Sequence, residues 1–465
     1  MTTQTPTPAA PREIPFIKGA PLIGNLITFG RDSIGTIDRV WKEHGDIFRI
    51  QLAGNRSFTI VSSPDLAHEA LVDRKATLRR PADVEGGTLL TPMLGLSVLT
   101  TDGETWFTRR RMMQPIFHRQ RIQAMGDTMA AGGARMLARW EKLPDRAEIM
   151  LNEEMKLVTL DIINGTMFSS DILPEVDRIG HSVDVGLHYT QSIVRNPIRL
   201  PATWPTPGNR RFWAAKALLD DYLYRMIRER RASAEKKGDL LDMLLEARDE
   251  DTGKGMTDQE VRNEVATIYG AGHETTALAL TWTWYALSQN PEALRKLQAE
   301  VDSVLKGRAP TFADLPSLPF TLATLEESMR LFPPVPFTAR MAYAPLTLGE
   351  YALPQGAFVG IAINNIHRHP DFWEEPEAFK PERFLPENRA KINKNAYIPF
   401  LTGPHVCIGN TFALMEGHLL LAMIAQRYAM ALVPGQRIFK EQTITMRPKY
   451  GMRMVLKPRK AIPSP

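Results

Sequence analysis

The sequence predicts a mainly α-helical fold with a small β lobe near the N-terminus. Apolar and polar residues alternate on both sides of Gly54-Asn55, which is typical of a β-hairpin. From about Trp106 to Leu325 the apolar residues recur with the period of an α-helix. A last apolar helix is expected from about residue 409 to residue 428, after a proline-rich stretch.

The helix signals follow one another along the chain. Ser63-Pro64 starts a short helix, since proline favours the first helical position. Thr257 and Glu260 have the spacing of a capping box, and the apolar period then continues without a break for about thirty residues. At 1.5 Å per residue this helix would be roughly 45 Å long, enough to cross the whole molecule. A further helix ends at Gly307.

No repeat or long linker divides the chain. Short strands are expected again at residues 346–363, within the same domain. We therefore predict a flexible N-terminal segment over residues 1–20 and a single domain over residues 21–465. The N-terminal segment is polar and proline-rich, and it lacks the apolar run of a signal peptide or a membrane anchor.

Composition and charge indicate a globular protein with a large core. The 465 residues include 43% hydrophobic and 23% charged residues, and the net charge is +5. This charge is mild for the length, so no nucleic-acid partner is expected. The long apolar stretches are interrupted by charges, so no transmembrane span is expected either. We predict a monomer in the cytoplasm, since a single cysteine is in keeping with reducing conditions.

The only cysteine, Cys407, stands in the segment PFLTGPHVCIGN, directly before the last helix. One cysteine excludes a disulfide framework within the chain and a four-cysteine iron–sulfur cluster. The simplest interpretation of a lone cysteine is a small buried hydrophobic residue. Here, however, a thiolate would lie at a helix N-terminus, where the helix dipole favours an anion. Gly403 and Gly409 would let the backbone turn tightly beside a flat partner, and a thiolate ligand of haem iron fits this setting.

The pattern FxxGxxxCxG around Cys407 resembles the haem-binding loop of the cytochrome P450 superfamily, the haem-thiolate monooxygenases. The resemblance implies haem b with Cys407 as the iron ligand. It also implies a triangular-prism fold with the haem between the long helix and the cysteine loop. The family most often has arginine where this chain has His405, which can still donate to a haem propionate but titrates near neutral pH. The haem contacts implied in this loop are Phe400, His405, Cys407 and Gly409.

The segment AGHETT in the middle of the long helix resembles the oxygen-activation motif of the same family. Gly272 would leave room for O₂ over the iron. Cleavage of the O–O bond needs two protons, and the resemblance places Thr275 near the oxygen and Glu274 as a relay towards solvent. Adjacent helical residues point about 100° apart, so the two can act in series. The alternative is a threonine hydrogen-bonded to its own helix and a solvated glutamate without a chemical role.

Two further segments resemble the haem-propionate contacts of the family. Trp106 and Arg110 lie on one helix face in WFTRRR, and Arg340 in FTARMA follows a Pro-Pro turn. Arginine suits this role because its planar guanidinium pairs with a carboxylate through two hydrogen bonds.

Glu327 and Arg330 in EESMRLF, with Arg383 in FKPERF, resemble a buried ion-pair network that supports the haem loop in the family. On a helix surface, a pair at the Glu327–Arg330 spacing would contribute only roughly 0.2–0.5 kcal/mol. In a buried network, loss of one member leaves a charge without its partner, so the predicted role is structural.

The other arginines near Trp106 have two interpretations. They can form an ordinary solvated helix face. The resemblance offers a second use, because an acidic electron donor docks on the cysteine side of the haem in this family, and a basic patch would steer it. The arginines concerned are Arg109, Arg111, Arg119 and Arg121.

The resemblance also predicts a mainly apolar substrate pocket, lined by the loop before Trp106, the long helix, the segment PVPFT and the turn MRPKYG at residues 446–451. With few charges there, the expected substrate is lipophilic, such as a fatty acid, a terpenoid or a steroid. The predicted reaction is insertion of one oxygen atom from O₂, as hydroxylation or epoxidation. The predicted pocket residues are Leu96, Ser97, Val98, Thr267, Ala271 and Phe337.

Electrons are expected from separate proteins, because the sequence shows no flavin domain and no second cysteine for an iron–sulfur centre. The expected partners are a ferredoxin or a flavodoxin with its NAD(P)H reductase. One alternative is a peroxide-driven or isomerising haem-thiolate enzyme, although such members generally lack the acid–alcohol pair. Another is a non-catalytic haem-binding sensor, which would need neither a proton relay nor an apolar pocket.

Overall fold

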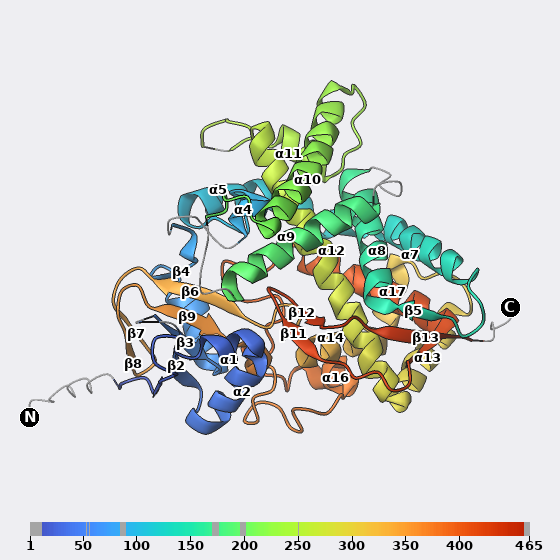
Figure 1. The fold of residues 1–465 in the computed structure, drawn as a ribbon. Coiled ribbons are helices and arrows are strands. Elements are labelled where there is room, and N and C mark those ends of the chain that lie inside the picture. Colours follow the sequence, from blue (N-terminus) through green and yellow to red (C-terminus); the bar gives the residue numbers. More distant parts are fainter. Residues whose placement is uncertain are drawn as a thin grey trace, which may run out of the picture.

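The computed structural model describes residues 12–52, 54, 56–83, 90–169, 176–195, 201–249 and 251–459. Helices make up most of this part of the chain. The largest sheet gathers with α1 (Leu26–Arg31) and α2 (Ser33–His44) in a lobe on one side of the molecule (Figure 1). The prediction of a mainly α-helical fold with a small β lobe is therefore confirmed.

The remaining helices of the described residues include several that pack against one long helix, α12 (Asp258–Gln289). None of them is both long enough and apolar enough to span a membrane. They are α3 (Pro64–His68), α4 (Thr91–Leu94), α5 (Gly103–Met113), α6 (Arg119–Ala124), α7 (Gly126–Trp140), α8 (Leu151–Ile163), α9 (Val176–Arg195), α10 (Pro207–Ala232), α11 (Leu240–Glu246), α13 (Pro291–Leu305), α14 (Pro319–Leu331), α15 (Ile363–Ile366), α16 (Pro386–Arg389) and α17 (Asn410–Arg427).

The sheet of the β lobe combines two distant parts of the chain. Two of its neighbouring strands form the predicted antiparallel hairpin, with Ile47 opposite Val61. Beside that hairpin lies a buried parallel strand from much later in the sequence, so the lobe is not confined to the N-terminal region as predicted. In order across the sheet, the strands are β1 (Phe16–Ile17), β2 (Ile47–Gln51), β3 (Ser57–Val61), β9 (Phe358–Ile361), β6 (Thr338–Ala342) and β4 (Leu78–Arg79).

Three smaller sheets complete the strands of the described residues. The turn at residues 443–445, between the two strands of one of them, reaches the cavity described below. One sheet has the order β10 (Tyr428–Leu432), β13 (Arg453–Pro458) and β5 (Glu148–Met150); the others pair β11 (Lys440–Gln442) with β12 (Met446–Pro448) and β7 (Leu346–Leu348) with β8 (Tyr351–Leu353).

Residues 12–20, which the sequence placed in a flexible segment, pack on the sheet. Phe16 pairs with Arg49 where β1 runs parallel to β2, and Ile14 is buried in the core of the lobe. The predicted boundary at residue 20 stays a prediction. Residues 1–11 of the same prediction lie outside the described residues.

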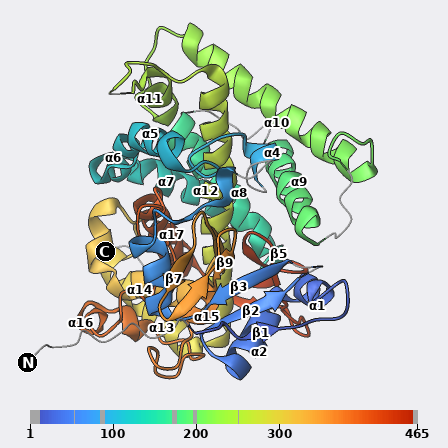
Figure 2. The same ribbon diagram turned by 90° about the vertical axis from the view of Figure 1, so that its left-hand side faces the viewer.

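α12 is the central element of the helical part and runs through the molecule (Figure 2). It starts at the predicted capping box, in which the Thr257 N–H donates to Glu260 Oε2 at 2.9 Å and the Glu260 N–H donates to Thr257 Oγ1 at 3.3 Å. Most side chains between Val261 and Leu287 are buried, because α8, α10, α14 and α17 pack around the helix. Such enclosure is what a helix that is apolar on most of its faces requires.

Candidate active site

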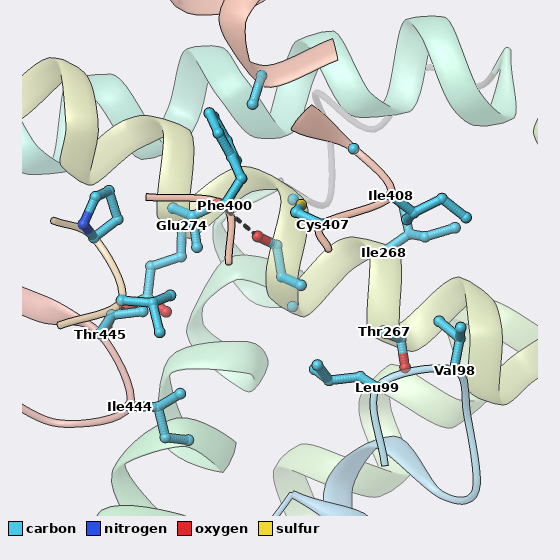
Figure 3. A pocket seen from close by; sticks show the side chains of 18 of the residues that line it. Val98, Leu99, Thr267, Ile268, Glu274, Phe400, Cys407, Ile408, Ile444 and Thr445 are labelled. Atoms are coloured by element: carbon cyan, nitrogen blue, oxygen red, sulfur yellow. Dashed lines mark hydrogen bonds between the residues drawn. The ribbon is translucent and has the colours of Figure 1, made fainter. Parts of the chain in front are cut away.

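A cavity of about 470 Å³ lies between α12 and the loop that carries Cys407. Figure 3 shows Cys407 and Phe400 on one wall, with Val98 close to Thr267 on one side and Thr445 on the other. Most of the lining side chains are apolar. A cavity of this kind suits an apolar ligand that is held by a few polar groups.

Cys407 lies just before α17, as predicted. Its backbone N–H donates to Phe400 O at 2.9 Å, and the helix begins three residues later. Cys407 is exposed to the cavity, but the cavity lies inside the protein. Its thiol is therefore strongly desolvated. Burial raises the pKa of this thiol, whereas the Gly409 N–H and the Arg110 guanidinium favour the thiolate. A bound metal cation would favour the thiolate much more strongly, because a coordinating thiol is deprotonated.

The backbone requires glycine at position 403 but not at position 409. Gly403 has a φ of +74°, and a Cβ there would lie 2.5 Å from the carbonyl oxygen of Leu71. Gly409 has an ordinary φ of −90°, and a Cβ there would meet only Phe117 Cε1, at 4.0 Å. The predicted tight turn therefore depends on Gly403 and not on Gly409, whereas the predicted close approach of Gly409 to a flat partner stays a prediction. Gly409 instead keeps a side chain out of the cavity wall.

Three guanidinium groups face one end of the cavity, those of Arg80, Arg110 and Arg340. Arg340 is 2% exposed, and within the described residues its Nη2 has no hydrogen-bond partner. Burial lowers the pKa of Arg340 to about 10. Burial, together with the charges of Arg340 and Arg110, lowers the pKa of Arg80 to about 9. Such buried positive charge calls for an anion.

His405 lies at the same end, between Trp106 and Asp102. Its ring centroid is 4.3 Å from that of Trp106, and its Nε2 is 3.3 Å from Asp102 Oδ1 without hydrogen-bond geometry. Burial opposes ionisation of Asp102, but His405 and the N–H groups of Gly103 and Arg80 lower its pKa to about 2. Among the described residues at this end, one carboxylate does not balance three arginines, so an excess of positive charge remains there. A contact of His405 with a propionate stays a prediction.

These groups fit the haem that the resemblance predicts. The arginines suit its two propionate groups, and the thiol of Cys407 is chemically suited to its iron. The apolar walls between Cys407 and α12 suit its ring system. Arg80 was not predicted from the sequence, because Arg-Arg-Pro at residues 79–81 matches no ligand motif.

Glu274 and Thr275 are adjacent on α12 but reach different neighbours. Thr275 lines the cavity, and its hydroxyl donates to Ala271 O at 2.7 Å. Glu274 is 4% exposed and accepts a hydrogen bond from Thr445 Oγ1 at 3.2 Å. The alternative of a solvated glutamate is therefore wrong. Any relay from Glu274 towards solvent must pass through other groups.

Charged side chains of three elements act on Glu274. Burial raises the pKa of Glu274 to about 7, and Asp184 on α9 acts in the same direction. Lys156 on α8 and Arg447 on β12 act in the opposite direction. Lys156 Nζ is 3.0 Å from Asp184 Oδ2, so the opposite effects of these two charges on the pKa of Glu274 largely cancel. The carboxyl group can therefore take up and release a proton near neutral pH.

Gly272 has a packing role that its sequence motif did not reveal. A Cβ there would lie 2.8 Å from Ile163 Cδ1 on α8. Glycine therefore lets α8 approach α12 closely. The predicted role of Gly272 in leaving room for O₂ stays a prediction, and its neighbour Ala271 also lines the cavity.

The predicted substrate residues are only partly in the right place. The prediction is wrong for Leu96 and Ser97, neither of which lines the cavity. Leu96 is 51% exposed, and the Ser97 hydroxyl turns towards Thr100 Oγ1 at 3.3 Å. The register of the loop instead brings Leu99 to the cavity. The predicted residues that do line it are Val98, Thr267, Ala271 and Phe337.

The structure divides the arginines near Trp106 into bound and exposed ones. Arg109 is buried, with Nη1 3.0 Å from Glu264 Oε1. Nη2 of Arg111 is 2.7 Å from Asp249 Oδ2. Neither of these two is free to steer a partner. The other two, Arg119 and Arg121, are exposed.

Glu327, Arg330 and Arg383 come together as predicted. Arg330 donates to both carboxylate oxygens of Glu327 at 2.8 Å, and both side chains are fully buried. Arg383 Nε lies 3.5 Å from Glu327 Oε1. The network thus ties α14 to the segment that leads to the cysteine loop, since Arg330 also donates to the carbonyl oxygens of His367, Pro376 and Ala378.

Comparisons with known proteins agree with this geometry. The sequence model of the family described as cytochrome P450 matches residues 14–455. Cyclooctatin synthase of Streptomyces melanosporofaciens is 35% identical over 453 residues, which cover 96% of this chain and 94% of that protein. Cyclooctat-9-en-7-ol 5-monooxygenase of the same organism is 33% identical over 440 residues, covering 92% and 94%. The crystal structure of the cytochrome P450DA heme domain aligns with a TM-score of 0.86 at 26% identity, covering 97% of this chain and 99% of that one.

Proposed function

The chain belongs to the cytochrome P450 family, which makes it a haem-dependent monooxygenase, and we propose that it hydroxylates or epoxidises a cyclic terpenoid. The cavity carries this proposal. Apart from His405 and the arginines of its polar end, the described lining residues include no cationic side chain. With the arginines engaged by propionates, no cation remains for the carboxylate of a fatty acid. The relative named cyclooctat-9-en-7-ol 5-monooxygenase supports this choice, because its name describes oxidation of an unsaturated alcohol.

Cys407 and the arginine cluster hold the cofactor in this proposal. When bound, haem supplies the activation of O₂. Cys407 provides the thiolate ligand of the iron, and Arg80, Arg110 and Arg340 bind the propionates. Trp106 keeps His405 in place at the same end, with their ring centroids 4.3 Å apart.

Thr275 and Glu274 hold and move protons in this proposal. The hydrogen bond from Thr275 to Ala271 O leaves the lone pairs of its hydroxyl oxygen open to a donor in the cavity. Glu274 stores a proton next to the cavity wall, where Thr445 holds its carboxyl group at 3.2 Å. Because Glu274 points away from Thr275, a water molecule or a rotation of the Glu274 side chain must connect the two.

An acidic electron donor is the remaining partner in this proposal. Arg119 and Arg121 are both exposed in α6, shortly after Phe117, which lines the cavity. A ferredoxin or a flavodoxin with an acidic face would be steered there over long range. Arg109 and Arg111 do not belong to this patch, because acidic side chains of this chain already bind them.

A ligand panel tests the substrate class. Cyclic terpenoid alcohols, fatty acids and steroids would each be titrated into the holoprotein while the haem spin state is followed. Compounds that shift it would then be incubated with a ferredoxin and its reductase, and the products analysed by mass spectrometry. We expect spin-state shifts and oxygenated products with terpenoid alcohols. Shifts and products with fatty acids or steroids alone would contradict the proposal.

A further inference from the structure

One turn of α12 holds the backbone of the loop that forms a wall of the cavity. This turn consists of Arg262, Asn263 and Glu264, and the loop, taken as residues 93–99, includes the last two residues of α4. All three side chains are directed at backbone atoms of the loop. Arg262 Nη2 donates to Met93 O at 3.0 Å, Asn263 Nδ2 donates to Leu96 O at 3.2 Å, and the Val98 N–H donates to the carboxylate oxygens of Glu264 at 3.0 and 3.1 Å.

The loop is shaped to receive Asn263. Gly95 has a φ of +70°, and a Cβ at this position would lie 2.2 Å from Asn263 Oδ1. Any side chain at position 95 would therefore displace Asn263 from the loop. The Thr100 hydroxyl also donates to Gly95 O at 2.6 Å, which closes the turn around this contact.

The same turn of α12 also ties down a second wall. Arg262 Nε donates to Asp220 Oδ1 on α10 at 2.8 Å. Asp220 directly follows Leu219, which lines the cavity. Arg262 thus connects the loop to α10. Thr267, which follows it five residues later on α12, lines the cavity.

Stability alone does not account for charged groups at this place. Glu264 is fully buried, and Arg262 is 2% exposed. Burial raises the pKa of Glu264 to about 7, although the Val98 N–H and Arg109 both favour its ionised form. Apolar residues of similar volume would often stabilise a protein as well or better than buried ion pairs. Directional hydrogen bonds to a backbone instead fix a position.

We propose that Arg262, Asn263 and Glu264 act as a positioning clasp that fixes loop 93–99 against the cavity and so selects which ligands reach the haem. Four side chains of this loop line the cavity, those of Met93, Leu94, Val98 and Leu99, and Figure 3 labels the last two. The clasp residues themselves do not line the cavity. The inference rests on the proposed function, since it takes the cavity as the place where haem and substrate bind.

Two azole ligands of the haem iron test the clasp without knowledge of the substrate. Imidazole is small enough to reach the iron without contacting loop 93–99, whereas the phenyl group of 4-phenylimidazole must pack against that loop. The variants are Asn263→Ala, which removes one bond to the loop, and Glu264→Gln, which weakens another. Glu260→Gln is the matched control, because Glu260 also binds Arg109, at 3.1 Å, and glutamine preserves the capping box. Dissociation constants are measured by haem absorbance in the holoproteins.

We expect 4-phenylimidazole to bind about tenfold more weakly to both clasp variants, the loss expected from one hydrogen bond that holds the loop. The affinity for imidazole should stay unchanged, and Glu260→Gln should match the parent for both ligands. Unchanged binding of 4-phenylimidazole, or an equal loss for both azoles, would overturn the clasp. If Glu264→Gln fails to fold, Asn263→Ala alone decides. A parent protein that binds neither azole through its haem would instead refute the proposed cavity.

Discussion

Arg80, Arg110 and Arg340 bring three positive charges to one end of the cavity, where Asp102 supplies one negative charge. In the chain alone this arrangement is unfavourable, because burial lowers the pKa of Arg340 to about 10. Two propionates would restore the balance. Arg340, whose Nη2 has no hydrogen-bond partner within the described residues, should therefore matter for holding haem far more than for folding the chain.

Replacement of Arg340 by Gln should separate these two effects. We expect haem to pass from the variant to apomyoglobin at least about tenfold faster than from the parent, as for the loss of one charge-assisted hydrogen bond. The apoprotein should be no less stable, since an unbalanced charge is removed. Arg74→Gln is the control, because Arg74 pairs with Glu69 at 3.0 Å on the surface and does not line the cavity. Equal haem loss from both variants would contradict the role of Arg340.

The pKa of Glu274 predicts how product formation depends on pH. Burial and Asp184 raise this pKa to about 7, against Lys156, Arg447 and Thr445. Glu274 therefore carries a proton below about pH 7 and loses it above. We expect the product formed per electron pair to fall as the pH rises from about 6 to about 8, one unit on either side of the pKa. Oxygen uptake and product are to be measured together.

Glu274→Gln provides the comparison for that profile. Glutamine keeps the size of the side chain and can still accept the hydrogen bond from Thr445, but it does not titrate. Its coupling should be low and independent of pH over this range. A variant that retains the slope of the parent would show that another group delivers the proton.

At the scale of elements, the conformation of the cysteine loop depends on Gly403, a residue that has no chemical role in binding the iron. Gly403 combines a φ of +74° with a backbone neighbour 2.5 Å from its Cβ position. The loop can therefore lie against Leu71 only if position 403 has no side chain. This contact joins the cysteine loop to the segment after α3, and so to the β lobe.

Gly403→Ala should lower the thermal midpoint and the haem content of the purified protein. Backbone strain alone costs about 1 kcal/mol, and the contact with Leu71 O adds to it. Gly435→Ala separates the two effects, because Gly435 has a φ of +77° and no atom within 4 Å of its Cβ position. We expect Gly435→Ala to lose stability through strain only and to keep its haem. Equal effects of both substitutions would refute the importance of the Leu71 contact.

At the scale of the whole molecule, the Glu327–Arg330 pair connects the helical part to the segment before the cysteine loop. Glu327→Ala should destabilise the protein by about 3–5 kcal/mol, because it leaves Arg330 buried without its carboxylate. Glu382→Ala is the control. It removes an exposed pair with Lys296, at 2.8 Å, and should cost no more than about 1 kcal/mol. Thermal unfolding of the holoproteins would show the difference, and similar midpoints would contradict a buried network.

Much of the fold could be predicted, because its signals are local. The capping box at Thr257 and Glu260 and the unbroken apolar period define α12, and Gly54 marks the hairpin of β2 and β3. The place of β9 beside β3 could not be predicted, since strand pairing across so many residues has no local signal. The strand β1 could not be predicted either, because two residues are too short a run to show alternation.

The candidate site could be predicted where a motif carried it, as for Cys407. The sequence did not predict site residues correctly when membership of the site depends on the direction of a side chain. Leu96 and Ser97 stand beside Val98 in the sequence, yet only Val98 faces the cavity. The direction of Glu274 towards Thr445 depends on a turn far away in the sequence.

The central claim is that Cys407 supplies the thiolate ligand of the haem iron, and the carbon monoxide complex of the reduced protein tests it most directly. Cys407 is the only cysteine of the 465-residue chain, so no other thiol of this chain can replace it. The parent should show the absorbance band of a thiolate-ligated complex, and Cys407→Ser should lose that band while the arginines still retain haem. A Cys407→Ser protein that kept the thiolate band would contradict the account.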